Sequence, residues 1–268
     1  MQRRDKIDFL GIGAHGAGST WLWHWLAKHP EIGFLKEGAG RGIPGKDVHY
    51  WNRFQDQPLD WYLDQFDWDR RVVGEITPAY ARVEPELVRH IYAAFPAAQI
   101  FYIVREPLSR TWSDVRKRVR KASPWHRRRL RWMIEQGARD KVGIRNDYAG
   151  TTARWAEVFG TDQVHVFLFS DIAEKPRQLL GRACKILGVD AGFYDTIGDE
   201  HLGSRVNTGL DKACPPDFIK WFEQQDITPF GQQLSTIEEL GCLERLPAQH
   251  EPVAAIGNDT TQRQATVR

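Results

Sequence analysis

The chain has 268 residues, a length typical of one α/β domain or two small ones. Hydrophobic residues make up 41% of it, and 37 basic against 35 acidic side chains leave a formal charge of +2, which argues against a general nucleic-acid binder. The three cysteines have neither metal-ligand spacing nor a disulfide pattern, so we predict no metal site. The sequence has no signal-peptide apolar region and no apolar run long enough to span a bilayer. We therefore expect a cytoplasmic protein that is not inserted in a membrane.

Short apolar runs alternate with amphipathic stretches along most of the chain. In chain order they predict a strand over 9–13, a helix over 21–26, a loop over 31–58, a helix over 60–66, a strand over 72–76, a helix over 85–95, a strand over 99–104, a helix from 108 or 109, a helix over 148–159, a strand over 164–169 and a helix over 176–187. Continuous apolar strands that alternate with helices are typical of a buried parallel sheet. We predict an α/β fold of P-loop type, with a central parallel sheet and helices on both faces, in a single domain over 1–250. The polar stretch 251–268 predicts a disordered C-terminal tail.

The first predicted strand leads into a helix through the glycine-rich segment 11–22, Gly-Ile-Gly-Ala-His-Gly-Ala-Gly-Ser-Thr-Trp-Leu. Glycines let a backbone turn tightly beside a ligand, and a helix N-terminus offers N–H groups to a phosphate. Ser19 and Thr20 add hydroxyl groups, although a plain tight turn with a Ser/Thr cap has the same pattern. The P-loop of nucleotide triphosphate enzymes ends in Gly-Lys-Ser/Thr. Ser19 occupies the position of that lysine, which disfavours a P-loop kinase.

A second candidate anion site follows the third long strand, in the segment 105–113, Arg-Glu-Pro-Leu-Ser-Arg-Thr-Trp-Ser. Arg105 stands at a strand's carboxyl end, where α/β sheets bind ligands, and Ser113 lies in the helix that follows. A guanidinium fork and a hydroxyl can converge on one phosphate. Without the glycine-rich loop, a structural ion pair for Arg105 and a helix-surface position for Ser113 would be the better interpretation. Two such sites at neighbouring strand ends favour a ligand with two separated anionic groups.

These segments resemble the sulfotransferases that use 3'-phosphoadenosine 5'-phosphosulfate (PAPS), and they are closest to the carbohydrate (heparan-type) branch and its bacterial relatives. Residues 13–22 resemble the 5'-phosphosulfate loop Gly-x-x-Lys-x-Gly-Thr-Thr/Ser-x-Leu. Residues 105–113 match the 3'-phosphate motif Arg-x-Pro-x-x-Arg-x-x-Ser at Arg105, Pro107, Arg110 and Ser113. Weaker similarities cover 46–51, 74–80 and 148–171, so the resemblance extends over about residues 7–245.

The resemblance implies a sulfotransferase that moves a sulfuryl group from PAPS to a hydroxyl or amine of a small molecule or carbohydrate and releases 3'-phosphoadenosine 5'-phosphate (PAP). It implies that PAPS lies across the carboxyl edge of the sheet. The residues implied to hold the 5'-phosphosulfate are those of the loop and first helical turn: Gly16, Ala17, Gly18, Ser19, Thr20 and Trp21. Arg105 and Ser113 correspond to the residues that hold the 3'-phosphate, and Arg205 falls in a late loop that closes over the nucleotide.

The candidate catalytic residues come from the same resemblance. Asp47 takes the place of the family's glutamate base and is one methylene shorter, while His49 is the alternative base or an acceptor ligand; a surface loop would explain both equally well. Two family lysines are missing, replaced by Gly16 and Ile76. The residues that could supply the missing charge are His15, Lys36, Lys46 and Lys117. A protein that binds PAP or PAPS without efficient catalysis is the alternative function.

Two features of the sequence favour different kinds of acceptor. Residues 116–131 contain nine basic side chains and no acidic one, which favours an anionic acceptor or a solvated helix that steers PAPS inward. Eleven tryptophans favour an aromatic or apolar acceptor, although most of them are expected to pack in the core. Both possibilities remain open.

Overall fold

The computed structural model describes residues 6–39, 45–121, 142–204, 206 and 213–247. At its centre lies one five-stranded sheet in which every pairing is parallel and the strand order is β2-β3-β1-β4-β5. The strands are β1 (Phe9–Gly13), β2 (Ile32–Gly33), β3 (Val72–Ile76), β4 (Gln99–Val104) and β5 (Val164–Leu168). The predicted α/β fold with a central parallel sheet is confirmed.

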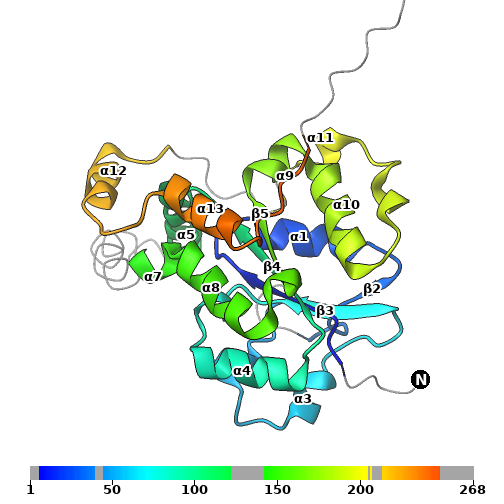
Figure 1. The fold of residues 1–268 in the computed structure, drawn as a ribbon. Coiled ribbons are helices and arrows are strands. Elements are labelled where there is room, and N and C mark those ends of the chain that lie inside the picture. Colours follow the sequence, from blue (N-terminus) through cyan, green and yellow to red (C-terminus); the bar gives the residue numbers. More distant parts are fainter. Residues whose placement is uncertain (1–5, 40–44, 122–141, 205, 207–212, 248–268) are drawn as a thin grey trace, which may run out of the picture.

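Helices cover both faces of this sheet (Figure 1). One face carries α1 (Ser19–Leu26) and α10 (Pro176–Leu187), which pack against each other, and the other carries α4 (Pro85–Ala94) and α8 (Tyr148–Phe159). Every residue of β1 and β3 is buried. Burial on both faces explains why these strands read as continuous apolar runs, and it makes the sheet the core of the fold.

Apart from the 15-residue helix α5 (Pro107–Lys121), which follows β4, the remaining described elements are helices of at most ten residues and single 3₁₀ turns. The others are α2 (Tyr50–Arg53), α3 (Leu59–Leu63), α7 (Val142–Asn146), α9 (Ser170–Glu174), α11 (Asp199–Leu202), α12 (Pro216–Glu223) and α13 (Phe230–Glu239), with single 3₁₀ turns at Tyr80–Arg82, Thr161–Gln163 and Ala191–Tyr194. The boundaries of the four predicted strands agree within one residue with those of β1, β3, β4 and β5.

The stretch 31–58, predicted as a loop with little regular structure, holds two short elements among its described residues. It contains β2, which pairs with β3, and the one-turn helix α2. A two-residue strand has no periodicity of its own, because its hydrogen bonds to β3 alone define it. The helix predicted over 60–66 ends earlier, at Leu63, where the chain turns back into an antiparallel bridge between Leu35 and Phe66.

The edge of β5 is protected by a distant part of the chain. The Val166 amide donates to the Cys242 carbonyl and the Glu244 amide donates to the Val166 carbonyl, both at 2.8 Å. Covering an edge strand in this way prevents it from pairing with other molecules. The predicted disordered tail, 251–268, lies outside the described residues.

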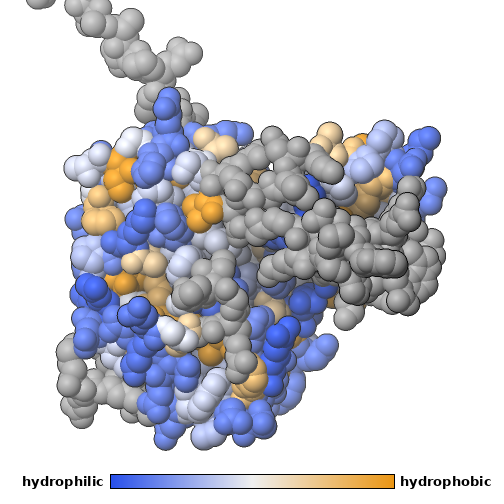
Figure 2. Space-filling view, turned by 180° about the vertical axis from the view of Figure 1, so that it is seen from behind, coloured by the Kyte–Doolittle hydropathy of each residue, from blue (hydrophilic) through white to orange (hydrophobic). Residues whose placement is uncertain are grey.

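The face of the molecule seen in Figure 2 is predominantly hydrophilic where the structure describes it. On the face seen in Figure 2, hydrophilic residues surround separate, small hydrophobic patches. Within the described ranges, no helix combines the length and apolar character needed to cross a membrane. The described side chains also include no group of three or more His, Cys, Asp or Glu residues placed to hold a metal ion.

The sheet topology determines where a ligand can bind. After β1 the chain forms β2 and β3 on one side of β1, and it then crosses to the other side to form β4. The connections that follow β1 and β4 therefore run in opposite directions along the sheet. Such a switch point leaves a crevice at the carboxyl ends of the two strands. Here that crevice lies between the glycine-rich loop after β1 and Arg105 after β4.

Candidate functional site

The loop after β1 needs glycine at two positions for steric reasons. Gly16 has φ of 83° and Gly18 has φ of 96°, both in the left-handed region. A Cβ at Gly18 would lie 2.3 Å from the Ile172 Cδ1 atom, and a Cβ at Gly16 would lie 3.0 Å from the Arg110 carbonyl oxygen. Gly18 is also the N-cap of α1 and makes no side-chain cap, so the first N–H groups of this helix face the loop without an intrahelical acceptor. This geometry is suited to an anion.

Arg110 attaches the loop to helix α5. The Arg110 side chain is almost fully buried, with 1% of its surface exposed. Its Nε donates to Asn146 Oδ1 at 2.6 Å, its Nη1 to the His15 carbonyl at 3.2 Å and its Nη2 to Thr111 Oγ1 at 2.8 Å. All three guanidinium nitrogens therefore donate hydrogen bonds to groups of the protein. The second arginine of the matched motif holds the loop in place and does not line the cavity.

Arg105 lies at the carboxyl end of β4 and reaches the same loop. Its Nη1 donates to the Gly16 carbonyl at 3.1 Å, and its guanidinium carbon lies 4.0 Å from the centre of the Phe169 ring. The Tyr148 hydroxyl donates to the Arg105 carbonyl at 2.7 Å, which fixes the backbone behind the side chain. Stacking on an aromatic face orients the guanidinium plane.

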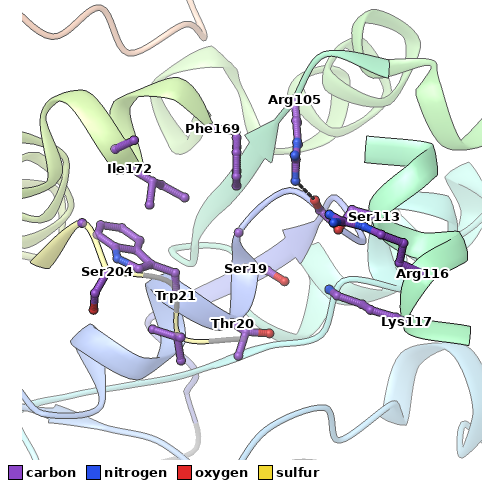
Figure 3. Close-up of a pocket in the computed structure, with 15 residues that line it drawn as sticks. Ser19, Thr20, Trp21, Arg105, Ser113, Arg116, Lys117, Phe169, Ile172 and Ser204 are labelled. Carbon is purple, nitrogen blue, oxygen red and sulfur yellow. Dashed lines mark hydrogen bonds between the residues drawn. The ribbon is translucent and has the colours of Figure 1, made fainter. Parts of the chain in front are cut away.

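These elements enclose a cavity of about 260 Å³ (Figure 3). Ser19, Thr20 and Trp21 lie on the side of α1, and Arg105 and Ser113 lie across from them. The described lining residues are Gly16, Gly18, Ser19, Thr20, Trp21, Arg105, Ser113, Arg116, Lys117, Phe169, Ile172, Ala173, Gly203, Ser204 and Val206. The cavity thus combines a helix N-terminus, hydroxyl groups and basic side chains with an apolar wall.

Most of the residues predicted to bind the nucleotide meet at this cavity. Gly16, Gly18, Ser19, Thr20, Trp21, Arg105 and Ser113 line it, whereas Ala17 is buried behind the loop. Arg205 lies outside the described residues, although both its neighbours, Ser204 and Val206, line the cavity. Helix α11 (Asp199–Leu202), which precedes the late loop, is tied to α1 because Trp21 Nε1 donates to the Leu202 carbonyl at 2.6 Å.

Sequence reasoning missed the apolar wall formed by Phe169, Ile172 and Ala173. Phe169 follows β5 immediately, at the same carboxyl edge as Arg105. The position after a predicted parallel strand was the available signal, because residues there face the crevice. Ile172 and Ala173 carried no such signal, since they come from the short helix α9.

Asp47 and His49 occupy a separate, strained segment that does not line the cavity. Both have φ of 62°, and they are the described non-glycine residues with left-handed backbone. The Lys46 ammonium is 3% exposed and donates to Asp47 Oδ1 at 2.7 Å, while Asp47 is 20% exposed. Burial lowers the pKa of Lys46, and the neighbouring Asp47 and Glu75 carboxylates act in the opposite direction. Strain and a buried ion pair in one segment are characteristic of functional sites.

Glu75 is the buried carboxylate behind this segment. It accepts hydrogen bonds from the Tyr62 hydroxyl at 2.6 Å, the Thr77 hydroxyl at 2.5 Å and the Tyr80 hydroxyl at 3.0 Å. Burial raises the pKa of Glu75, and these three hydrogen bonds oppose that rise because they stabilise the carboxylate. Three hydroxyl donors therefore hold a fixed acceptor at the end of β3, next to the Lys46–Asp47 pair.

His15 lies on the far side of the loop from the main cavity. It lines a separate small hollow with Arg82 and Arg145. Burial lowers its pKa to about 3; the Asp114 carboxylate raises it, and the positive charges of Arg82, Lys46 and Arg145 lower it further. A group with this pKa is neutral at pH 7. His15 therefore cannot supply the positive charge that the glycine-rich loop lacks, and it is placed away from the other predicted residues.

Comparison with known proteins agrees with the geometry. A family model described as "Sulfotransferase family" matches residues 9–193. Human heparan sulfate glucosamine 3-O-sulfotransferase 3B1 is 26% identical over 198 residues, which are 68% of this chain and 47% of the relative. Human heparan sulfate glucosamine 3-O-sulfotransferase 6 is 30% identical over 114 residues, or 42% of this chain and 30% of the relative. The chain thus spans less than half the length of these curated relatives.

Solved structures share the whole fold. A sulfotransferase from Alicyclobacillus acidocaldarius superposes with a TM-score of 0.61 at 22% identity and covers 88% of this chain and 95% of its own. The sulfotransferase domain of the Synechococcus PCC 7002 olefin synthase superposes with a TM-score of 0.50 at 18% identity, over 92% and 99% of the two chains. At these identities the similarity establishes the fold.

Gly18→Ala is expected to lower both the free energy of unfolding, by about 1–2 kcal/mol, and the affinity for anionic ligands. The added methyl group would force a left-handed residue to carry a Cβ against Ile172. Gly181→Ala is the matched control, because a Cβ at this position in α10 meets no atom within 4 Å. That change should stabilise the protein by about 0.5–1 kcal/mol. Urea denaturation of the two variants measures the changes in stability, and titration calorimetry with inorganic phosphate measures the change in affinity. Equal stabilities of the two variants would contradict the loop geometry.

Proposed function

Because this chain belongs to the sulfotransferase family, we propose that it transfers the sulfuryl group of PAPS to a hydroxyl or amine of a small-molecule or carbohydrate acceptor. The family uses PAPS as its sulfuryl donor. The observation that carries the proposal is the cavity in which the first turn of α1 faces Arg105 and Ser113 (Figure 3). Its two groups of donors suit a ligand with two separated phosphate-type groups.

The residues of the cavity suit the parts of PAPS in a definite orientation. The N–H groups at the start of α1, with the Ser19 and Thr20 hydroxyls, would hold the 5'-phosphosulfate. The Arg105 fork and the Ser113 hydroxyl would hold the 3'-phosphate. The apolar wall formed by Phe169 and Ile172 gives the uncharged adenosine a surface to pack on. PAPS supplies the activated sulfuryl group, and these residues bind and orient it.

Asp47 is the proposed general base. Its carboxylate is partly exposed, whereas the Lys46 ammonium that it contacts is buried, so one side of the carboxylate is fixed and the other is accessible. A fixed carboxylate can take the acceptor's proton as the acceptor oxygen or nitrogen attacks the sulfur. Such a base contributes about 10²- to 10⁴-fold to the rate.

His49 is the alternative base. Burial lowers its pKa, so the ring is neutral at pH 7. Its Nδ1 lies 3.1 Å from Asn52 Oδ1, and the tautomer that donates from Nδ1 to this oxygen has Nε2 as its basic nitrogen. Neutral His49 can therefore accept a proton or a hydrogen bond from an acceptor hydroxyl.

A second candidate function is nucleotide binding with little catalysis. It is favoured by one observation, the absence of lysine at Gly16 and Ile76. The Ile76 side chain is 1% exposed and packs in the core. A protein of this kind binds PAP tightly and transfers no sulfuryl group to any acceptor.

Thermal unfolding with added nucleotides tests the proposed function. We expect PAP to raise the melting temperature more than ATP or NAD does at the same concentration, since a ligand at 100 times its Kd adds about 2.7 kcal/mol of stability. Production of PAP from PAPS with a panel of hydroxyl and amine acceptors then separates the enzyme from the binding protein. A shift with ATP and Mg²⁺ but none with PAP would favour a kinase and contradict the proposal.

Arg105→Ala is expected to weaken PAP binding by about 1.5–3 kcal/mol, the value of a charged hydrogen bond. The change also removes the bond to the Gly16 carbonyl and the stacking on Phe169. Arg105→Lys keeps the charge but loses the fork, so its affinity should lie between those of the alanine variant and the native protein. Isothermal titration calorimetry measures all three, and unchanged affinity in the alanine variant would exclude Arg105 from the site.

Asp47→Asn is expected to lower the turnover number by at least a hundredfold while PAP affinity changes less than threefold. The amide keeps the shape of the side chain but cannot take a proton at neutral pH. Turnover with PAPS and calorimetry with PAP are measured on the same preparation. His49→Gln serves as the parallel variant, because it removes the basic nitrogen of the alternative base. Full activity in the Asp47 variant with loss in the His49 variant would transfer the role to His49.

A further inference from the structure

The glycine-rich loop lacks a positive charge at the place where sulfuryl transfer develops negative charge. When the bond between sulfur and the bridging oxygen breaks, its electron pair stays on the 5'-phosphate. A donor aimed at such developing charge is worth about 10²- to 10³-fold in rate. The need for a cation here rests on the proposed function, and the structure limits which residue can supply it.

The loop itself has no space for a side chain at Gly16. A Cβ there would lie 3.0 Å from the Arg110 carbonyl oxygen and 3.6 Å from Ser113 Cβ, with φ of 83°. Helix α5 therefore packs directly on the loop at this position. The Ile76 side chain is buried and packs on Gly11 of β1, where a Cβ would meet it at 2.6 Å. A lysine at Gly16 would require the surrounding backbone to move.

Three of the four residues that could replace the missing charge are excluded by their surroundings. Lys36 is exposed and does not line the cavity. The Lys46 ammonium is buried against the Asp47 carboxylate at 2.7 Å. His15 is neutral at pH 7 because burial lowers its pKa to about 3, and it lines the other hollow.

The fourth residue, Lys117, lines the cavity from helix α5. It lies four residues after Ser113, so the two side chains share one face of the helix. Figure 3 shows the Lys117 side chain with its nitrogen at the end that faces Ser19 and Thr20, at the start of α1. In the described part of the chain it is the one lysine among the lining residues, and Arg116 lies beside it.

We propose that Lys117 is a catalytic residue whose ammonium group neutralises the 5'-phosphate of PAPS as it leaves. The acceptor oxygen or nitrogen forms the new bond to sulfur, the bond from sulfur to the bridging oxygen breaks, and the acceptor's proton passes to the base. Lys117 stays protonated and donates a hydrogen bond to the departing phosphate. The close packing of α5 on Gly16 thus removes the side chain from the loop and brings a cation from the helix to the same cavity.

The binding test compares three nucleotides with the full chain. PAP carries both phosphates, adenosine 5'-monophosphate only the 5'-phosphate and adenosine 3'-monophosphate only the 3'-phosphate. Lys117→Met should lower the affinity for the first two by about tenfold or more and leave the third within twofold, because Lys117 contacts the 5'-phosphate alone. Lys117→Arg keeps the charge and should retain most of the affinity. Lys185→Met, which removes an exposed lysine of α10, is the matched control and should change nothing.

The rate test uses conversion of PAPS to PAP, with water or a hydroxyl compound as acceptor, under single-turnover conditions. Lys117→Met should slow this step by about 10²- to 10³-fold, and Lys117→Arg should restore much of it. Melting temperatures of the variants verify that each is folded.

The outcomes separate this inference from the proposed function. If the native protein binds none of the three nucleotides, the proposed function fails and this inference fails with it. If the native protein binds PAP and converts PAPS, but Lys117→Met leaves 5'-phosphate affinity and rate unchanged, the role of Lys117 is refuted and the proposed function stands. A loss confined to adenosine 3'-monophosphate also refutes it, because it assigns Lys117 to the other phosphate.

Discussion

The packing of helix α5 on the glycine-rich loop is the contact on which the rest of the site depends. At Gly16 the loop backbone approaches α5 so closely that a Cβ would lie 3.0 Å from the Arg110 carbonyl oxygen. Two arginines donate hydrogen bonds to the loop backbone, Arg110 to the His15 carbonyl and Arg105 to the Gly16 carbonyl. The loop after β1 is thereby joined to the strand and helix that follow β4. A crevice that topology alone would leave open becomes a cavity with fixed walls.

This contact also bears on the role proposed for Lys117, because it leaves no space for a side chain at Gly16. Transition-state stabilisation depends on where a charge lies relative to the leaving group, and the position of the residue in the sequence is secondary. In this fold the loop and α5 border the same cavity, so under the proposed function a cation on α5 can take the place of one on the loop. Ser113 and Lys117 lie one helical turn apart on α5, which lets one helix address both ends of the ligand. The alternative, a loop that carries the lysine itself, would require α5 to move away from Gly16.

Sequence analysis predicted the features that local chemistry determines. The apolar runs identified four strands of the sheet, and glycines at a strand-to-helix turn identified the loop. Features that arise from long-range packing were not predictable in the same way. Arg110 matches a phosphate-binding motif as well as Arg105 does, but burial against Asn146 and Thr111 commits it to the protein interior. His15 is of a residue type common in catalysis, but burial lowers its pKa to about 3, so the ring is neutral at pH 7. The two-residue strand β2 exists only because β3 lies next to it.

The Lys46–Asp47 pair shows why stability alone does not explain this part of the molecule. Removing an ammonium group from water costs several kcal/mol, and a single carboxylate returns only part of that cost. The same segment holds Asp47 and His49 in left-handed backbone, which adds about 1–3 kcal/mol of strain at each. Behind it, Glu75 is held by three hydroxyl donors although burial disfavours its charge. A segment selected for stability would have an apolar residue at Lys46 and glycine at the strained positions. The unfavourable contributions coincide on Asp47 and His49, the two residues proposed as the general base, and this coincidence supports that proposal.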